Sequence, residues 1–192
     1  MKAILNILLL LLTVVILSQC EKDEPNPEVK IPDNNFLNAL IALGIDTNGD
    51  GVISTAEAEV ITSLNVNNWF IQDLKGIESF INLDTLYCMN NHLTTLDISN
   101  CTALKWLSCS NNQLSILDVS NNTTLEELFC YNNQLTTLDV SNNTILTILS
   151  CGLNQLTALD VSNNNALEKI SCIDNQITSL DVSDCIFPAV QE

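Results

Sequence analysis

The apolar positions of this chain recur with a period of 21 residues. In one repeat, leucines at 104 and 107 precede Cys109, and Asn112 and Leu114 follow it. The cysteine position returns in each repeat, at Cys88, Cys109, Cys130, Cys151 and Cys172. A fixed period of this length is typical of a solenoid, whose coils pack only on their neighbours. We therefore predict stacked coils over residues 63–185, with the recurring apolar side chains inside.

Each repeat contains a second, weaker symmetry. The pattern around Leu107 and Cys109 returns ten residues later around Leu117 and Val119. Alternating apolar residues are typical of strands, so we expect both halves of a coil to be extended. An atypical first coil, with Leu64 matching Leu86 at an offset of 22, joins the repeats to the preceding segment.

Two asparagine columns follow the same period. One comprises Asn91, Asn112, Asn133, Asn154 and Asn175, and the other comprises Asn122, Asn143 and Asn164, with Cys101 and Cys185 in its first and last places. A buried amide can both donate to and accept from backbone groups that a turn leaves unpaired. We predict this role for both columns.

The cysteine column is predicted to consist of buried, unreactive thiols. Coils stack about 4.8 Å apart, which exceeds the Cβ separation of about 3.5–4.5 Å that a disulfide requires. A metal site would need converging ligands, and the single histidine, His92, is predicted to lie on a turn.

Before the repeats, residues 33–62 have the pattern of a small helical cap. Apolar residues at helical spacing run from Asp33 to Leu43, and a second helix is expected from Thr55 to Ile61. The loop between them matches D-x-[DN]-x-[DN]-G-x5-E, an EF-hand-like calcium pattern. Its predicted Ca²⁺ ligands are Asp46, Asn48, Asp50, Val52 (through its carbonyl), Ser54 and Glu57. Because the site is single, we expect one structural Ca²⁺ rather than a switch; the alternative is a relic loop that folds without metal.

The amino terminus is predicted to be an export signal. Residues 1–19 are a short cationic start followed by an apolar run, as in a signal peptide. The residues up to Cys20 resemble a bacterial lipobox, which makes Cys20 the predicted lipid attachment site; plain secretion and an uncleaved anchor are the alternatives. Residues 20–32 form an acidic, proline-containing linker, and 186–192 a short carboxyl-terminal tail. The acidic residues after Cys20 resemble the export signal of Bacteroidota surface lipoproteins, with a solvated linker as the alternative. The resemblance implies a lipid-anchored protein of the bacterial outer membrane or cell surface.

Charge and composition exclude several functions. The formal net charge is −17 and there is no arginine, so nucleic-acid binding is not expected. With one histidine and no converging nucleophile and base, we expect no enzyme. A further column, Asp97, Asp118, Asp139, Asp160 and Asp181, is predicted to be a solvated edge, with a weak cation-binding strip as the alternative.

Strand residues that alternate with the buried ones face solvent and form the candidate binding face. Its large side chains are Tyr87, Met89, Trp106, Phe129, Tyr131 and Ile148. Exposed aromatic clusters often anchor interfaces, so we predict binding of a protein, peptide or glycan here. The alternative is that these residues only cover the sheet, which would leave a structural or adhesive spacer without a specific ligand.

The phrase L-x-x-L-x-C-x-x-N-x-L resembles the leucine-rich repeat, with cysteine in place of the third leucine. The order of parts, from helical cap with a loop to repeats, is similar to internalin-like proteins and to surface lipoproteins of the Bacteroidota. The resemblance covers about residues 31–185. It implies a leucine-rich-repeat solenoid, that is, a right-handed parallel β coil of 21-residue repeats, with a small helical EF-hand-like N-terminal cap.

Overall fold

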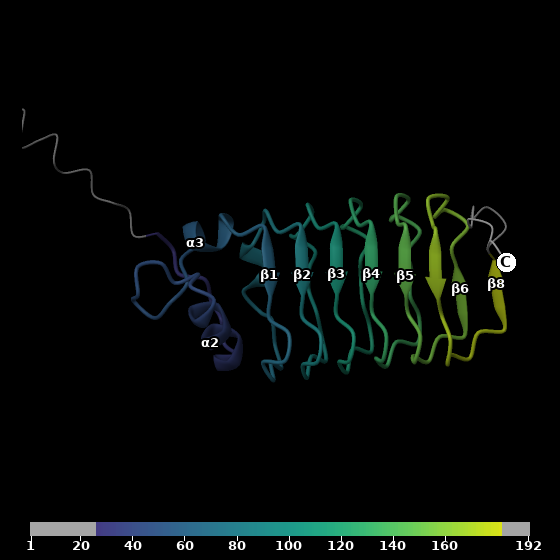
Figure 1. The fold of residues 1–192 in the computed structure, drawn as a ribbon, viewed down its shortest axis with the longest axis horizontal. Coiled ribbons are helices and arrows are strands. Elements are labelled where there is room, and N and C mark those ends of the chain that lie inside the picture. The colour runs from purple at the N-terminus through teal and green to yellow at the C-terminus, as the bar shows by residue number, and fades with distance from the viewer. Residues whose placement is uncertain (1–25, 182–192) are drawn as a thin grey trace, which may run out of the picture.

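Six short strands form one parallel sheet along the molecule (Figure 1). They are β1 (Ser63–Asn65), β2 (Thr85–Tyr87), β3 (Trp106–Ser108), β4 (Glu127–Phe129), β5 (Ile148–Ser150) and β7 (Lys169–Ser171). Leu64 pairs with Leu86, 22 residues on, and Leu86 with Leu107, 21 residues on. Both predicted offsets are therefore confirmed. The computed structural model describes residues 26–181; the predicted signal peptide, Cys20, Cys185 and the tail 186–192 lie outside them.

The second half of each coil is less regular than the sequence predicts. Only β6 (Ala158–Asp160) and β8 (Ser179–Asp181) pair as a second parallel sheet within the described residues. In earlier coils the matching residues are not strands, although Leu117 and Val119 are buried as expected. The alternation thus predicted which side chains are buried, but not the backbone pairing.

The core is a continuous apolar column between the two sides of the coils. Leu86, Leu107, Leu128 and Leu149 succeed one another along it with at most 1% of their surface exposed. Because every coil contributes the same kinds of side chain at the same depth, each one continues the packing of the last.

Two short helices close the amino-terminal end of the solenoid: α2 (Asn34–Ala42) and α3 (Thr55–Glu59) (Figure 1). The Asp33 carboxylate accepts hydrogen bonds from the N–H groups of Asn35 and Phe36 and so begins α2. Helix α3 has a capping box formed by Ser54 and Glu57. It ends at Glu59, two residues before the predicted limit, and an exposed Val60 follows as its C-cap.

The cap is joined to the first coil by specific contacts. The second oxygen of Asp33 accepts hydrogen bonds from the backbone of Gln72 and Asp73, at 2.7 and 3.0 Å. The rings of Phe36 and Phe80 are in contact, with centroids 6.4 Å apart. One aspartate therefore both begins a helix and fixes that helix to the repeats. The extended segment before it also pairs with the cap, since the Val29 N–H donates to the Ile53 carbonyl.

The first asparagine column has the predicted role. The Asn133 amide donates to the carbonyls of Cys109 and Cys130, and its oxygen accepts the Leu114 N–H. One side chain thus joins its own coil to the preceding one. In the second column, Asn143 donates to the carbonyls of Val119 and Asn122, but its buried oxygen accepts no hydrogen bond.

A third column lies beside the first. Its members have a positive φ, between 49° and 56°: Asn90, Asn111, Asn132, Leu153 and Asp174. Asparagine and aspartate tolerate this left-handed conformation, whereas leucine is strained there. Leu153 therefore departs from the repeat at a position where the positive φ of a leucine lowers stability.

Candidate functional site

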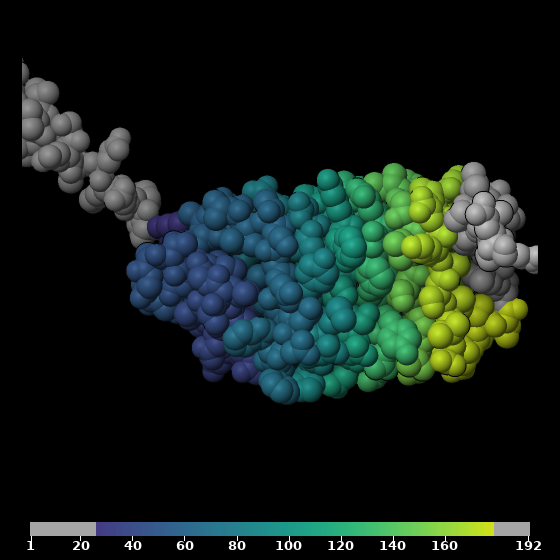
Figure 2. Space-filling model, in the orientation of Figure 1, coloured from purple at the N-terminus to yellow at the C-terminus, as the bar shows by residue number. Residues whose placement is uncertain are grey.

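The six predicted binding residues lie on the outward side of the β1–β7 sheet. We call Tyr87, Met89, Trp106, Phe129, Tyr131 and Ile148 the aromatic strip; all six side chains are half-buried. The strand residues between them, such as Leu107 and Leu128, face the core. In Figure 2 the coils appear as successive colour bands on a continuous surface, so residues of neighbouring coils are placed side by side.

The aromatic rings of the strip are in direct contact. Trp106 and Phe129 are stacked, with centroids 5.9 Å apart and planes inclined by 23°. Tyr87 lies on the preceding strand, 6.2 Å from the Trp106 ring centroid. Trp106 thus has an aromatic neighbour toward either end of the solenoid, and the three side chains form one continuous aromatic surface.

Small residues alternate with the large ones on this face. Ser108 and Ser110 share a coil with Trp106, yet only 4% and 6% of their surface is exposed. Further along, Gly152 is closely surrounded: a Cβ there would lie 3.0 Å from the Ile173 carbonyl oxygen and 3.3 Å from the Tyr131 ring, which is tighter than usual packing. The large side chains therefore cover the small residues, so this face is a packed surface rather than a set of independent side chains.

Glu127 is the acidic member of this face. Register places it between Trp106 on β3 and Ile148 on β5. Burial raises the pKa of the Glu127 carboxyl, an effect that Lys169 opposes and Glu126 reinforces. A partly desolvated carboxylate is a group that gains from a cationic partner.

The predicted calcium loop wraps around the Asp46 carboxylate. Asp46 accepts hydrogen bonds from the N–H groups of Gly49, Asp50 and Gly51. Asn48 and Asp50 lie next to it and bond to each other, at 2.9 Å. Side-chain oxygens, which Ca²⁺ prefers, are therefore gathered at one side of the loop.

Glu57, the predicted closing ligand, has its two oxygens occupied by protein groups. One accepts from the N–H and hydroxyl of Thr47, and the other from the N–H and hydroxyl of Ser54. These hydrogen bonds lower the Glu57 pKa to about 2, with the Ser54 N–H as the largest cause. Among the described residues, no three Asp, Glu, His or Cys side chains are grouped to hold a metal. The oxygen donors fit Ca²⁺ chemically, and binding would require Glu57 to turn from Thr47 toward the loop.

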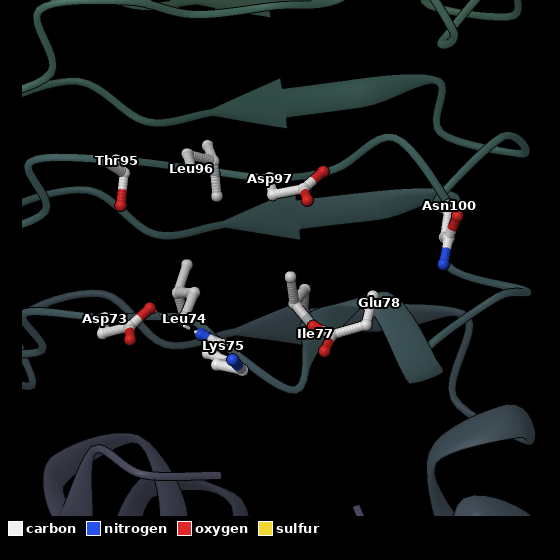
Figure 3. Close-up of a pocket in the computed structure, with 9 residues that line it drawn as sticks. All are labelled: Asp73, Leu74, Lys75, Ile77, Glu78, Thr95, Leu96, Asp97 and Asn100. Carbon is white, nitrogen blue, oxygen red and sulfur yellow. Dashed lines mark hydrogen bonds between the residues drawn. The ribbon is translucent and has the colours of Figure 1, made fainter. Parts of the chain in front are cut away.

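The aspartate column lies on the opposite edge. Asp97, Asp118, Asp139 and Asp160 each accept a hydrogen bond from the N–H of the serine two residues on. Beside Asp97 is a hollow of about 290 Å³ between two coils, whose lining residues are labelled in Figure 3. The local turns formed by these hydrogen bonds therefore explain the recurrence of aspartate at this position, which lies on a solvated edge.

The cysteine column consists of free thiols, as predicted. Cys88, Cys109, Cys130 and Cys151 are fully buried, and Cys172 is half-buried. Burial raises the pKa of Cys109 and of Cys151 to about 12. A thiol with such a pKa is not a nucleophile at neutral pH.

Leu153 and Ile173 lie beside the aromatic strip; sequence reasoning placed Ile173 in the same column as Tyr131 but missed Leu153. Leu153 is 37% exposed at a positive φ of 49°, and Ile173 is 61% exposed. The available signal was the Asn-Asn pair of earlier repeats, which becomes Leu153-Asn154 in this one. Both residues extend the apolar surface from Tyr131 toward the carboxyl-terminal end.

Known proteins similar to this chain share its repeats. A family model described as the LVIVD repeat matches residues 107–133, little more than one coil. Internalin J of Listeria monocytogenes is 41% identical over 71 residues, 37% of this chain and 8% of that protein.

Solved structures give a longer match. The functional domain of InlJ from Listeria monocytogenes, described as including a cysteine ladder, has a TM-score of 0.70 and 38% identity over 80% of this chain. A leucine-rich-repeat protein of Leptospira interrogans has a TM-score of 0.60 and 26% identity over 67%. The present chain covers only 39% and 36% of these two structures.

The cysteine ladder, the 21-residue register and the parallel sheet agree with these matches. Internalin-like leucine-rich-repeat proteins are non-catalytic, which agrees with the prediction that the chain is not an enzyme. In the described residues, no helix is long and apolar enough to cross a membrane. The chain is therefore similar to internalin-like leucine-rich-repeat proteins, and it forms a parallel solenoid of 21-residue repeats.

Proposed function

We propose that this protein is a non-catalytic binding module of the bacterial surface, which recognises a protein, peptide or glycan through the aromatic strip. The observation that carries the proposal is the contact of Tyr87, Trp106 and Phe129 on the open face of a rigid sheet. Aromatic side chains held in fixed positions provide contact area at a small cost in conformational entropy. Leucine-rich-repeat folds support protein binding in general.

The test is capture of ligands from surface proteins and glycans by the mature domain. Trp106→Ala, Phe129→Ala and Tyr131→Ala are expected to reduce capture, with folding monitored by circular dichroism. Ile116→Ala is a matched control, because Ile116 is apolar and 73% exposed but lies away from the sheet. Equal capture by all variants would favour the spacer alternative.

For the cap, we propose one structural Ca²⁺ held by Asp46, Asn48, Asp50, the Val52 carbonyl, Ser54 and Glu57. When bound, the ion would supply positive charge that holds the carboxylates of the loop together. The proposal predicts a higher melting temperature in Ca²⁺ than in excess chelator, and loss of that difference in Asp50→Asn. Identical melting curves would indicate a loop that folds without metal.

We further propose a location at the outer membrane or cell surface, with lipid on Cys20 as the only membrane contact. The lipobox-like sequence and the acidic residues after it support this anchor, and internalin-like proteins are typically bacterial surface proteins. Metabolic labelling with a lipid precursor tests it: Cys20→Ser should abolish labelling and release the protein from membranes. Retained labelling would place the lipid elsewhere.

A further inference from the structure

Glu127 places a carboxylate among the apolar side chains of the aromatic strip. Its neighbours on the sheet are Trp106 on one side and Ile148 on the other, and Phe129 follows on the same strand. The side chain is half-buried. Within residues 26–181 its carboxylate makes no hydrogen bond or close ion pair, and the one cation that acts on it there is Lys169, two strands away. A carboxylate in such surroundings is costly unless a cation pairs with it.

A second copy of this chain is a poor source of that cation. The sequence contains no arginine and six lysines against 23 acidic residues. Two molecules with a formal charge of −17 each repel one another. Charge complementarity therefore favours a different, basic partner.

The aromatic geometry distinguishes between classes of partner. A sugar ring that stacks on an aromatic side chain needs a free ring face. Trp106 is stacked on Phe129, and the Tyr87 ring on the preceding strand is tilted by 50° to it, so part of the Trp106 ring is already covered by its neighbours. A guanidinium, in contrast, can pair with the Glu127 carboxylate while its plane lies against the edge of this cluster.

We propose that the aromatic strip binds a protein segment with an arginine, or less strongly a lysine, on Glu127 and apolar side chains on either side of it. The apolar side chains contact Phe129 and Ile148, and the basic group neutralises the carboxylate between them. This inference rests on the proposed function of the strip and narrows its ligand to a basic, apolar peptide surface.

The experiment is selection of short random peptides on the mature domain at physiological ionic strength. Prior counter-selection on Trp106→Ser removes peptides that bind elsewhere on this acidic protein. The remaining peptides are expected to carry arginine flanked by apolar residues. Affinities of the best peptide are then measured for wild type, Glu127→Gln and Glu126→Gln. Glu126 is the matched control, because it is the adjacent carboxylate but is exposed.

We expect Glu127→Gln to weaken binding about tenfold or more, and Glu126→Gln less than about threefold. Replacing the peptide arginine by neutral citrulline should weaken binding to wild type equally, with little further loss in Glu127→Gln. Equal losses in both glutamate variants, or selected peptides without basic residues, would overturn this inference and leave the proposed function intact. If no peptide survives counter-selection, peptide recognition by the strip itself is refuted.

Discussion

At the scale of single residues, Leu153 is a position where this chain departs from its own repeat at a cost. The corresponding residues of neighbouring coils are Asn132 and Asp174, which share its positive φ. A leucine in the left-handed conformation costs about 1–2 kcal/mol relative to its preferred backbone. Leu153→Asn is therefore expected to raise the free energy of unfolding by about 1 kcal/mol, and Asn132→Leu to lower it similarly, as measured by urea denaturation. A decrease for Leu153→Asn would show that the apolar contacts of Leu153 outweigh the strain.

A second prediction at this scale concerns pH and Glu57. Its pKa is lowered from 4.5 to about 2 in the folded protein, so its ionised form stabilises the fold. That contribution is complete above pH 4.5 and is lost as the pH falls toward 2. In excess chelator, Glu57→Gln should be less stable at neutral pH by about 1–3 kcal/mol. It should also lose less stability than wild type between pH 5 and 2 (about the range set by the two pKa values).

Denaturation at a series of pH values measures this difference. Glu59→Gln is the control, because it removes the same charge from the same helix, and no side-chain hydrogen bond of Glu59 is found in the described residues. Parallel pH profiles for wild type and Glu57→Gln would mean that the Thr47 and Ser54 contacts do not form in solution.

At the scale of elements, the two asparagine columns differ in how much backbone they satisfy. Asn133 accepts one hydrogen bond and donates two, whereas Asn143 donates two and accepts none. The chain itself places Cys101 in the second column, where its thiol lies 3.6 Å from the Ile77 carbonyl. We therefore expect Asn133→Cys to cost about 1–3 kcal/mol more than Asn143→Cys, because it leaves an additional buried N–H unpaired. Equal losses of stability would contradict this account of the ladders.

The repeat period predicted the registers because coils of identical length must stack the same positions on one another. It could not predict that only β6 and β8 pair on the second side, since burial of Leu117 and Val119 is satisfied with or without a ladder hydrogen bond. The EF-hand-like pattern placed the loop between α2 and α3. The pattern did not reveal that Glu57 accepts hydrogen bonds from Thr47 and Ser54, because carboxylate oxygens can bind either a cation or nearby N–H groups.

At the scale of the whole molecule, the coils that the structure describes differ in how completely their cores are buried. At the amino-terminal end, α2 packs Phe36 against Phe80 of the first coil. Toward the other end, Ile170 and Cys172 are half-buried, whereas their counterparts Leu149 and Cys151 are buried. Because each coil contacts only its neighbours, local opening is expected to start where the core is least covered and to proceed toward the cap.

The cysteine ladder reports this order directly, since it provides one thiol in each of the five regular coils. Pulsed alkylation in low urea, with each cysteine followed by mass spectrometry, should label Cys172 first, then Cys151, Cys130 and Cys109, and Cys88 last. High pKa values keep the buried thiols unreactive until their coil opens. A variant with Phe36→Ala loosens the cap and should selectively accelerate labelling of Cys88. Identical rates at all five positions would mean that the solenoid opens as a single unit, and the graded stability inferred from its ends would then be wrong.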